Sequence, residues 1–426
     1  MAGTSMAPLI NPRFHKHPSP STSKMRFAGR RVAMVTFSAY PFDPRPRRAI
    51  DALVKEGASI DLICLGAENQ PRREAQGGVN VSRIPLKHVR RGKLDYAFRY
   101  AVFITIAFVI FAWRTVARRY DLVYVHNMPD ILVASALVPK LFGAKVVLDL
   151  HDPMPELMTT IFHPGSESGS VQLLKRLEKW SIGLADLVVT VNIACQRIFS
   201  TRSCRPEKIA VVMNSPDGQI FPFRAPQQRD FPTQIEKNPF VIMYHGSLVE
   251  RNGLDVAIDA LELVRNGVPS AELHVFGPST DFLERMLKKV HEKHLDEAVR
   301  YFGPKRLEEL VREIDKCDVG VIPNHRNAFT EINTPTRIFE YLALGKPVIA
   351  PSTPGILDYF SEKSLLFFEP GNPGDLANQM EFAFSHPNEL LEIVRNGQQV
   401  FLEHTWDRER ETLLSRTSGV LPGRKA

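Results

Sequence analysis

A carboxylate and a helix start lie close together in the second half of this chain, and together they could bind a nucleotide. The run Asn333–Ala350 reads NTPTRIFEYLALGKPVIA, in which a polar loop opens a short helix, Glu340 lies inside it and an apolar strand follows. A carboxylate there can accept hydrogen bonds from two neighbouring hydroxyls, while the free amides of the helix start hold a phosphate. Ribose plus diphosphate is what a nucleotide-sugar presents. The alternative is a surface helix with one solvated Glu.

A glycine turn with a basic residue lies earlier in the same half. Residues 244–261 read YHGSLVERNGLDVAIDAL and run from a strand through Gly246 into a turn and a helix. Gly246 allows close backbone approach, and the planar guanidinium of Arg251 can bind a diphosphate through two nitrogens. Such a turn fits phosphate binding and an ordinary strand-to-helix connection equally well.

A polar pair follows a very apolar strand in the first half. His151 and Asp152 come directly after the run LDL in LDLHDPMPE (148–156). Ligands of doubly wound sheets bind outside the carboxyl ends of the strands, so this position favours a functional role. The alternative is a histidine whose ring is bound to a backbone carbonyl.

A basic helix start follows the first strand. Asp43, Arg45, Arg47 and Arg48 surround the beginning of the helix in SAYPFDPRPRRAIDAL (38–53). They could form an anion site on the acceptor side, or simply a solvated basic face.

Composition excludes several kinds of site. The cysteines Cys64, Cys195, Cys204 and Cys317 are scattered without a CxxC pair, which indicates a reducing compartment and argues against structural zinc. There is no DxD pair to hold a divalent ion against a diphosphate, and Asp149 and Asp152 around His151 are too weak a pattern for a metal site. We therefore expect neither a metal nor a cofactor.

Charge is divided unevenly along the 426 residues. Residues 1–200 carry 27 Lys and Arg against 15 Asp and Glu, and the rest carry 27 against 32, so a net +12 and −5 make up the total of +7. No nucleic-acid-binding motif accompanies the basic half, so we expect no nucleic-acid partner. An anionic membrane surface or a phosphorylated acceptor fits this charge better.

Short Val- and Ile-rich runs alternate with helix-like segments along the chain. Examples are VAMVTF (32–37), KVVLDLHD (145–152) and FVIMYHG (240–246). This pattern predicts two doubly wound α/β domains in tandem, with parallel sheets. The expected parts are a disordered tail (1–24), a first domain (25–216), a linker (217–238), a second domain (239–403), a returning helix (404–418) and a tail (419–426).

One apolar segment differs from the others. AFRYAVFITIAFVIFAW (97–113) has only Thr105 as a polar break from Tyr100 to Trp113, and basic residues flank it. Fourteen helical residues span about 21 Å, less than the roughly 30 Å of a bilayer core, so we expect no crossing. The helix near 97–117 is expected to contact a membrane surface or, alternatively, to be buried in the first domain.

These motifs together resemble the family 4 glycosyltransferases of the GT-B type. The strongest elements are PTRIFEYLALGKPVIA, YHGSL…RNGLD and DLHDPMPE, and the likeness runs from about Arg31 to Trp406. The resemblance implies two Rossmann-like domains facing each other across a cleft. It further implies transfer of a sugar from a nucleotide-sugar with retention at the anomeric carbon and without a metal.

The resemblance also implies roles for individual residues. Glu340 would hold the ribose, Arg251 and Arg337 the diphosphate, and His151 would touch the donor sugar near the reacting carbon. The first glutamate of the family's paired motif is displaced, because Ile332 stands eight residues before Glu340. Glu331, one residue further away, could take its place after a one-residue shift of the loop, or backbone amides around Asn333 and Thr334 could do so.

The acceptor and location follow from charge and hydropathy. A membrane glycolipid or a polyprenyl-diphosphate-linked saccharide fits the basic first half, which predicts a cytoplasmic protein peripheral on the inner face of the membrane. A nucleotide-sugar epimerase of the same fold, or a silent membrane subunit that only binds nucleotide-sugar, remain the alternatives.

Overall fold

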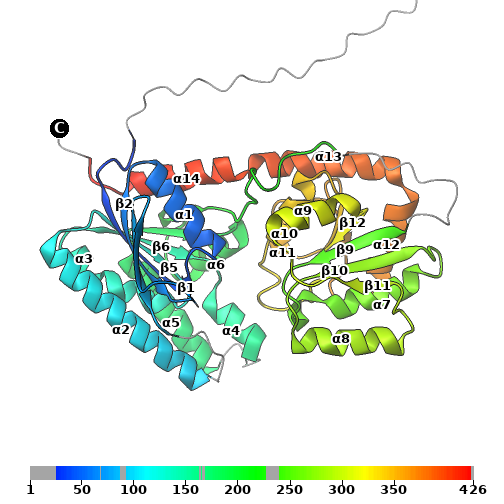
Figure 1. Ribbon diagram of the computed structural model, residues 1–426, viewed down its shortest axis with the longest axis horizontal. Coiled ribbons are helices and arrows are strands. Elements are labelled where there is room, and N and C mark those ends of the chain that lie inside the picture. The colour runs from blue at the N-terminus through cyan, green and yellow to red at the C-terminus, as the bar shows by residue number, and fades with distance from the viewer. Residues whose placement is uncertain are drawn as a thin grey trace, which may run out of the picture.

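Two α/β domains stand side by side in the computed structural model, each built on one sheet (Figure 1). The structure describes residues 25–67, 69–86, 93–162, 165, 168–226 and 239–423, except the side chains of residues 93, 94 and 96. The predicted tail 1–24 and residues 227–238 of the predicted linker lie outside this range.

The first sheet has eight strands in the order β3-β4-β2-β1-β5-β6-β7-β8. Neighbours pair in parallel, except that β3 is antiparallel to β4. Both faces are covered, so strands such as β6 are apolar and buried. The strands are β1 (Arg31–Ala39), β2 (Ser59–Leu65), β3 (Arg73–Gln76), β4 (Val79–Ile84), β5 (Leu122–His126), β6 (Lys145–Leu150), β7 (Leu187–Thr190) and β8 (Ile209–Val211).

Helices connect these strands and cover the sheet (Figure 1). They are α1 (Pro44–Lys55), α2 (Lys93–Ala117), η1 (Asp130–Ala136), α3 (Leu137–Leu141), α4 (Met154–Phe162), α5 (Gly169–Leu184), α6 (Ile193–Arg202) and η2 (Pro206–Lys208).

The second sheet has six parallel strands in the order β11-β10-β9-β12-β13-β14. They are β9 (Phe240–His245), β10 (Ala271–Phe276), β11 (Val299–Tyr301), β12 (Val319–Val321), β13 (Val348–Pro351) and β14 (Leu366–Phe368). Their helices are η3 (Glu250–Asn252), α7 (Leu254–Val264), α8 (Asp281–Glu292), α9 (Leu307–Lys316), α10 (Thr336–Ala343), α11 (Pro354–Leu357) and α12 (Pro373–Ser385). The predicted tandem of parallel α/β sheets is confirmed.

Two helices at the end of the chain run along both domains (Figure 1). α13 (Pro387–Glu403) lies on the second domain, and α14 (Trp406–Gly419) crosses back to pack against α1 and β8. Leu413 and Leu414 of α14 are buried in the core of the first domain. The Glu409 carboxylate accepts a hydrogen bond from the Met213 amide at 2.8 Å. The first domain is therefore completed by the last helix.

The α2 helix is longer than the apolar run predicted. It has 25 residues, and the stretch Ala97–Ala117 is long and apolar enough to cross a membrane by length and composition alone. The premise that this apolar helix is shorter than a bilayer core was therefore wrong. One face of the helix is buried in the first domain, where Phe103, Ala107 and Phe111 are inaccessible, and 22% of its most apolar window is buried in all.

Candidate functional site

The predicted site residues lie after the carboxyl ends of strands in both sheets. His151 follows β6 in the first domain, and Gly246 follows β9 in the second. Both positions are where doubly wound sheets bind ligands. The two domains also touch each other here, since the Asn192 side chain donates to the Ile332 carbonyl at 2.7 Å and Thr160 donates to Asn327 Oδ1 at 3.1 Å.

Glu340 lies in α10 with a largely buried carboxyl group. Its side chain is 15% exposed, and its Oε2 is 3.5 Å from Nε2 of the buried His245. Among the described residues no hydrogen-bond donor reaches this carboxyl. Burial raises its pKa to about 7, although the positive charges of Arg337 and Arg48 oppose the shift. A buried carboxyl without donors is suited to receive two hydroxyl groups from a ligand.

Arg337 is held beside this carboxyl by the loops that follow β9 and β12. Its guanidinium donates to the His245 carbonyl at 2.7 Å and to Asn324 Oδ1 at 3.3 Å. A Cβ at Gly246, whose φ is +130°, would come within 3.3 Å of the Arg337 side chain. Glycine at this position therefore gives Arg337 room, in addition to the close backbone approach predicted for a ligand.

Arg251 lies in η3, the short turn between β9 and α7. Its carbonyl accepts from the His325 amide at 3.1 Å, and its guanidinium lies 5.8 Å from the centre of the Phe329 ring. At Gly253 φ is +70°, and a Cβ would lie 1.8 Å from the Pro323 carbonyl oxygen. Only glycine lets the turn approach that loop, and this contact fixes where Arg251 lies.

The loop before α10 is occupied by contacts within the protein. The Glu331 carboxylate lies 3.0 Å from Arg326 Nε, and the Asn333 amide donates to the Thr330 carbonyl at 3.4 Å. The Thr334 hydroxyl donates to the Gly355 carbonyl at 2.6 Å. Donor binding by these three residues stays a prediction, but the Thr334 hydroxyl already has a structural partner.

His151 is joined to a buried polar network in the first domain. Its Nε2 is 3.0 Å from Nδ1 of His126, and its amide donates to Asn127 Oδ1 at 2.8 Å. The side chain is 18% exposed. Burial lowers the pKa of His151 well below its usual range and lowers that of His126 to about 4. Both rings are therefore neutral near pH 7, which predicts that His151 acts by hydrogen bonding rather than by charge.

Asp149 is the acceptor at the centre of this network. Its carboxylate accepts from Arg45 Nε and a terminal Arg45 nitrogen, at 2.9 and 2.7 Å, and from the Tyr124 hydroxyl at 3.0 Å. Burial raises the pKa of Asp149, but the positive charge and the hydrogen bonds of Arg45 outweigh burial, so the pKa is lowered and the carboxylate is ionised. His126, Asp149 and His151 each have one side-chain atom that could bind a metal, and these three atoms lie within 4.8 Å of one another. The neighbouring Arg45 charge disfavours a metal cation there.

The acceptor-side prediction for the start of α1 needs correction at Arg45. Its guanidinium is buried and bound to Asp149, to the Val212 carbonyl at 3.0 Å and to Asn214 Oδ1 at 2.9 Å. Asp43 caps α1 by accepting from the Arg45 amide at 3.2 Å. Arg47 is half-buried and follows on the same helix. Arg45 therefore holds the first domain together and does not present an exposed anion site.

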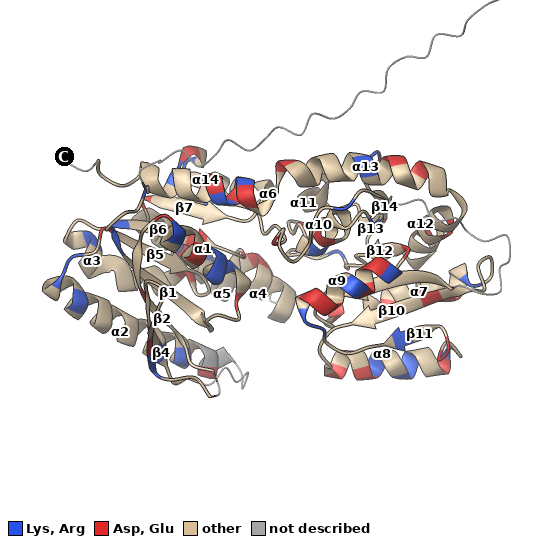
Figure 2. Ribbon diagram, turned by 45° about the horizontal axis from the view of Figure 1, so that its top comes forward, with Lys and Arg blue, Asp and Glu red and all other residues tan. Residues whose placement is uncertain are grey.

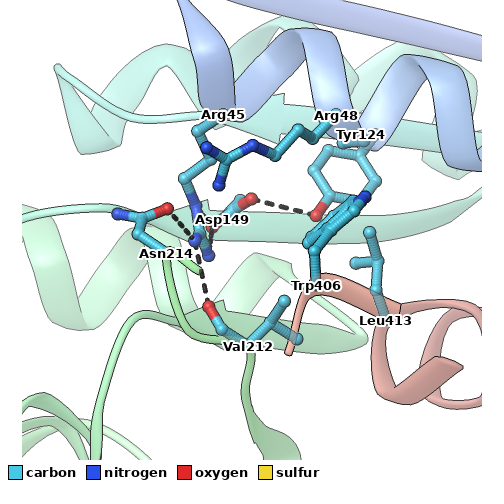
Figure 3. A pocket seen from close by; sticks show the side chains of 9 residues that line it. Arg45, Arg48, Tyr124, Asp149, Val212, Asn214, Trp406 and Leu413 are labelled. Atoms are coloured by element: carbon cyan, nitrogen blue, oxygen red, sulfur yellow. Dashed lines mark hydrogen bonds and ion pairs between the residues drawn. The ribbon is translucent and has the colours of Figure 1, made fainter. Parts of the chain in front are cut away.

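Arg48, the last of the basic residues named at the start of α1, faces a different surrounding from Arg45. It points toward a small pocket that Tyr124, Trp406 and Leu413 also line (Figure 3). Burial lowers its pKa to about 10, while Glu340 in the other domain raises it. Arg48 therefore links α1 electrostatically to the donor-side carboxyl. Its spacing of three residues from Arg45 signalled only a basic helix face.

Asp152 links the domains in a similar way. Burial raises its pKa to about 6, whereas the positive charges of Arg251 in the second domain and Arg45 in the first lower it. His245 was also missed, and its ring lies beside Glu340 with an Nε2 that has no partner among the described residues. In the sequence, the run YHG at the end of β9 indicated a glycine turn and gave no sign that the histidine lies beside Glu340.

Two family models match the two halves of the chain. The glycosyl transferase 4-like domain matches residues 42–215, and the glycosyl transferases group 1 domain matches residues 227–400. Among curated proteins, the probable glycosyltransferase WbjE of Pseudomonas aeruginosa is 23% identical over 55% of this chain and 58% of its own length. The amylovoran biosynthesis glycosyltransferase AmsK of Erwinia amylovora is 26% identical over 52% of each chain. The matches thus span about half the length of these curated relatives.

Solved structures match over nearly the whole chain. Sucrose-phosphate synthase from Thermosynechococcus elongatus superposes with a TM-score of 0.72 at 17% identity, over 92% of this chain and 99% of that one. Anabaena HepE in complex with UDP-glucose superposes with a TM-score of 0.67 at 16% identity, over 92% and 100%. At such identities the likeness establishes the two-domain fold alone.

Proposed function

Because this chain belongs to the GT-B glycosyltransferases, we propose that it transfers a sugar from a nucleotide-sugar to an acceptor with retention of anomeric configuration. The observation that carries the proposal is the Glu340 carboxyl, which is largely buried, has no donor among the described residues and has a pKa raised to about 7. Two ribose hydroxyls would supply the hydrogen bonds that the protein does not.

Cations and helix amides would stabilise the departing diphosphate. Arg337 lies beside Glu340 at the start of α10, and Arg251 lies in the turn after β9. Preorganised positive groups at a developing charge are usually the largest catalytic contribution of such a site. This arrangement needs no metal, and we assign no protein nucleophile.

His151 would contact the donor sugar from the opposite domain. Its ring is neutral, partly exposed and hydrogen-bonded to His126, and its backbone amide is held by Asn127. A neutral imidazole can donate or accept one hydrogen bond to a sugar hydroxyl. The second domain then binds the nucleotide, and the first domain positions the sugar that is transferred.

The acceptor is proposed to be a glycan carried by a membrane lipid, such as a glycolipid or a polyprenyl-diphosphate-linked saccharide, with the protein peripheral on the inner membrane face. The net +12 of residues 1–200 and the apolar α2 helix support this acceptor. AmsK is named for biosynthesis of the polysaccharide amylovoran, which supports a glycan product. HepE is a neighbour solved with UDP-glucose, so UDP-sugars are the first donors to test.

A screen of nucleotide-sugars by thermal unfolding tests the donor site. A ligand at 100 times its dissociation constant adds about 2.7 kcal/mol of stability, and we expect this from one nucleotide-sugar and its diphosphate. Glu340→Ala should lose the stabilisation, whereas Glu284→Ala, at an exposed position on α8, should keep it. Turnover of that donor should persist in EDTA. Absence of any stabilising nucleotide-sugar would contradict the proposal.

A further inference from the structure

The α2 helix carries apolar residues on its outward face as well as its buried face. Helices that pack on a domain ordinarily expose a polar face, so this outward stripe marks an interaction surface. Its most exposed member is Trp113, at 78%. The large exposed apolar residues of the stripe are Phe98, Val109, Trp113 and Val116.

The neighbouring helix α5 continues this surface. α2 and α5 both pack against η1 on the same side of the first sheet (Figure 1). Leu173 and Trp180 of α5 are exposed, whereas Ile182 of the same helix is buried in the core that also contains Phe103. Two apolar helix faces thus lie outward from one layer of the domain.

Basic side chains border these apolar residues. Arg118 and Arg119 follow α2, and Arg176 and Lys179 are exposed on α5. Acidic residues nearby are neutralised within the protein, since Asp95 pairs with Arg99 and Glu178 is buried against Arg202. Figure 2 shows basic residues near the α2–α3 end of this domain. The outward surface is therefore both apolar and positively charged.

We propose that this surface is a membrane-docking face, made of the outward sides of α2 and α5 together with Leu141 and Phe142 at the end of α3, and that it binds an anionic phospholipid bilayer. Leu141 is 84% exposed, and Phe142 lies under the Arg119 guanidinium at 5.7 Å. Apolar side chains entering the headgroup region and flanking cations near anionic lipids are the features of interfacial binding.

The helices dock in the plane of the membrane and do not cross it. A crossing would pull Phe103, Ala107 and Phe111 out of the first-domain core, where they are fully buried. Exposing those side chains to lipid gains nothing for the helix and leaves a cavity in the domain. The buried stripe therefore holds α2 on the protein, while the outward stripe contacts the bilayer.

Helix α4 packs against α5 and connects the docking face with the border between the domains. α4 ends at Ile161 and Phe162, both exposed, and its Thr160 hydroxyl accepts from the Phe329 amide of the second domain at 3.2 Å. A lipid-linked acceptor held at the face would thus approach the side of the molecule where the domains meet. This last link rests on the proposed function, but bilayer binding does not.

Vesicle flotation of the full chain tests the proposal. We expect the protein to float with vesicles of phosphatidylcholine plus phosphatidylglycerol, and less with phosphatidylcholine alone or at high salt. Replacing both Val109 and Trp113 by Ser should weaken binding at least about tenfold. Removing Arg118 or Arg119 should weaken it about fivefold per residue, because each basic residue near the surface contributes about 1 kcal/mol.

A matched control separates docking from general surface polarity. Leu263→Ser with Leu287→Ser removes two exposed apolar residues from α7 and α8 of the second domain and should leave flotation unchanged. Every variant should keep its melting temperature and its binding of the stabilising nucleotide. Flotation without nucleotide binding would overturn the proposed function but not the docking face. The docking face would be overturned if the wild-type protein did not float, or if all variants floated equally. It would also be overturned if the protein self-associated and the α2 variant abolished that self-association.

Discussion

At the scale of single residues, the charge of Glu340 should control nucleotide binding. The pKa of its carboxyl is about 7, raised by burial from an ordinary 4.5. Only the ionised form accepts hydrogen bonds from both ribose hydroxyls, so affinity for the stabilising nucleotide diphosphate should rise between pH 6 and 8. Isothermal titration at several pH values measures this. Glu340→Gln should retain only the pH dependence of the nucleotide itself.

The same pKa predicts the pH dependence of stability. Between pH 4.5 and 7 the folded protein still holds a proton that the unfolded chain has released. The stabilising contribution of the Glu340 proton to the free energy of unfolding is therefore complete below pH 4.5 and is lost as the pH rises through 7. Denaturation of the nucleotide-free protein should show wild type losing stability relative to Glu340→Gln over this window. A constant difference between the two proteins would mean an ordinary pKa.

His151 should affect turnover more than nucleotide affinity. It lies in the first domain, whereas Glu340 and Arg337 lie in the second, so His151→Ala should leave affinity for the nucleotide diphosphate within a few-fold. Turnover should fall about tenfold if the ring hydrogen-bonds the reacting sugar, because a typical hydrogen bond contributes about 0.5–1.5 kcal/mol. His294→Ala, in the loop after α8, is the control. Parallel loss of affinity and turnover would mean that His151 supports the fold of the cleft instead.

At the scale of elements, the turn that carries Arg251 depends on Gly253. Gly253 and Gly303 have φ of +70° and +74°, so alanine costs about 1 kcal/mol at either through backbone strain. Only at Gly253 would the added Cβ meet the Pro323 carbonyl, whereas nothing lies within 4 Å at Gly303. Gly253→Ala should therefore lose about 1–3 kcal/mol more in denaturation experiments, and lose nucleotide affinity. Equal losses of stability in Gly253→Ala and Gly303→Ala would show that the close contact with the Pro323 carbonyl does not affect stability.

At the scale of the whole molecule, Asn192 joins the two domains near the donor loop. Its side chain caps α6 through the Cys195 amide and donates to the Ile332 carbonyl and the Thr334 hydroxyl. Asn372 caps α12 and donates to the exposed Glu369 carboxylate at 3.0 Å, but it makes no bond to the described residues of the first domain, so Asn372→Ala should lower the free energy of unfolding by about 1 kcal/mol. Asn192→Ala should lower the free energy of unfolding by about 1–3 kcal/mol more, because the Ile332 carbonyl and the buried Thr334 hydroxyl lose a hydrogen-bond donor.

This domain contact should also appear in kinetics. If the Asn192 contact sets the distance between His151 and the donor loop, turnover should fall in Asn192→Ala while remaining unchanged in Asn372→Ala. Steady-state rates at saturating donor, beside denaturation curves, measure both effects. A destabilised Asn192→Ala protein with normal turnover would show that the contact serves stability alone.

Much of this molecule could be read from local sequence. Apolar runs such as KVVLDL mark buried parallel strands, and the strand-to-helix motifs placed Glu340, Gly246 and His151 after strand ends. These features depend on residues close together in the chain. Short strands such as β8 and β14, with three residues each, carried too little pattern to be predicted.

Other properties depend on residues far apart in the chain and were decided only by the tertiary structure. Arg45 reads as a free cation at a helix start, but Asp149 binds it across 104 positions and takes it out of solvent. The raised pKa of Glu340 arises because folding removes water without supplying a donor. The α2 helix reads as uniformly apolar, and only its packing on the first sheet determines which face is buried and which remains to meet a partner.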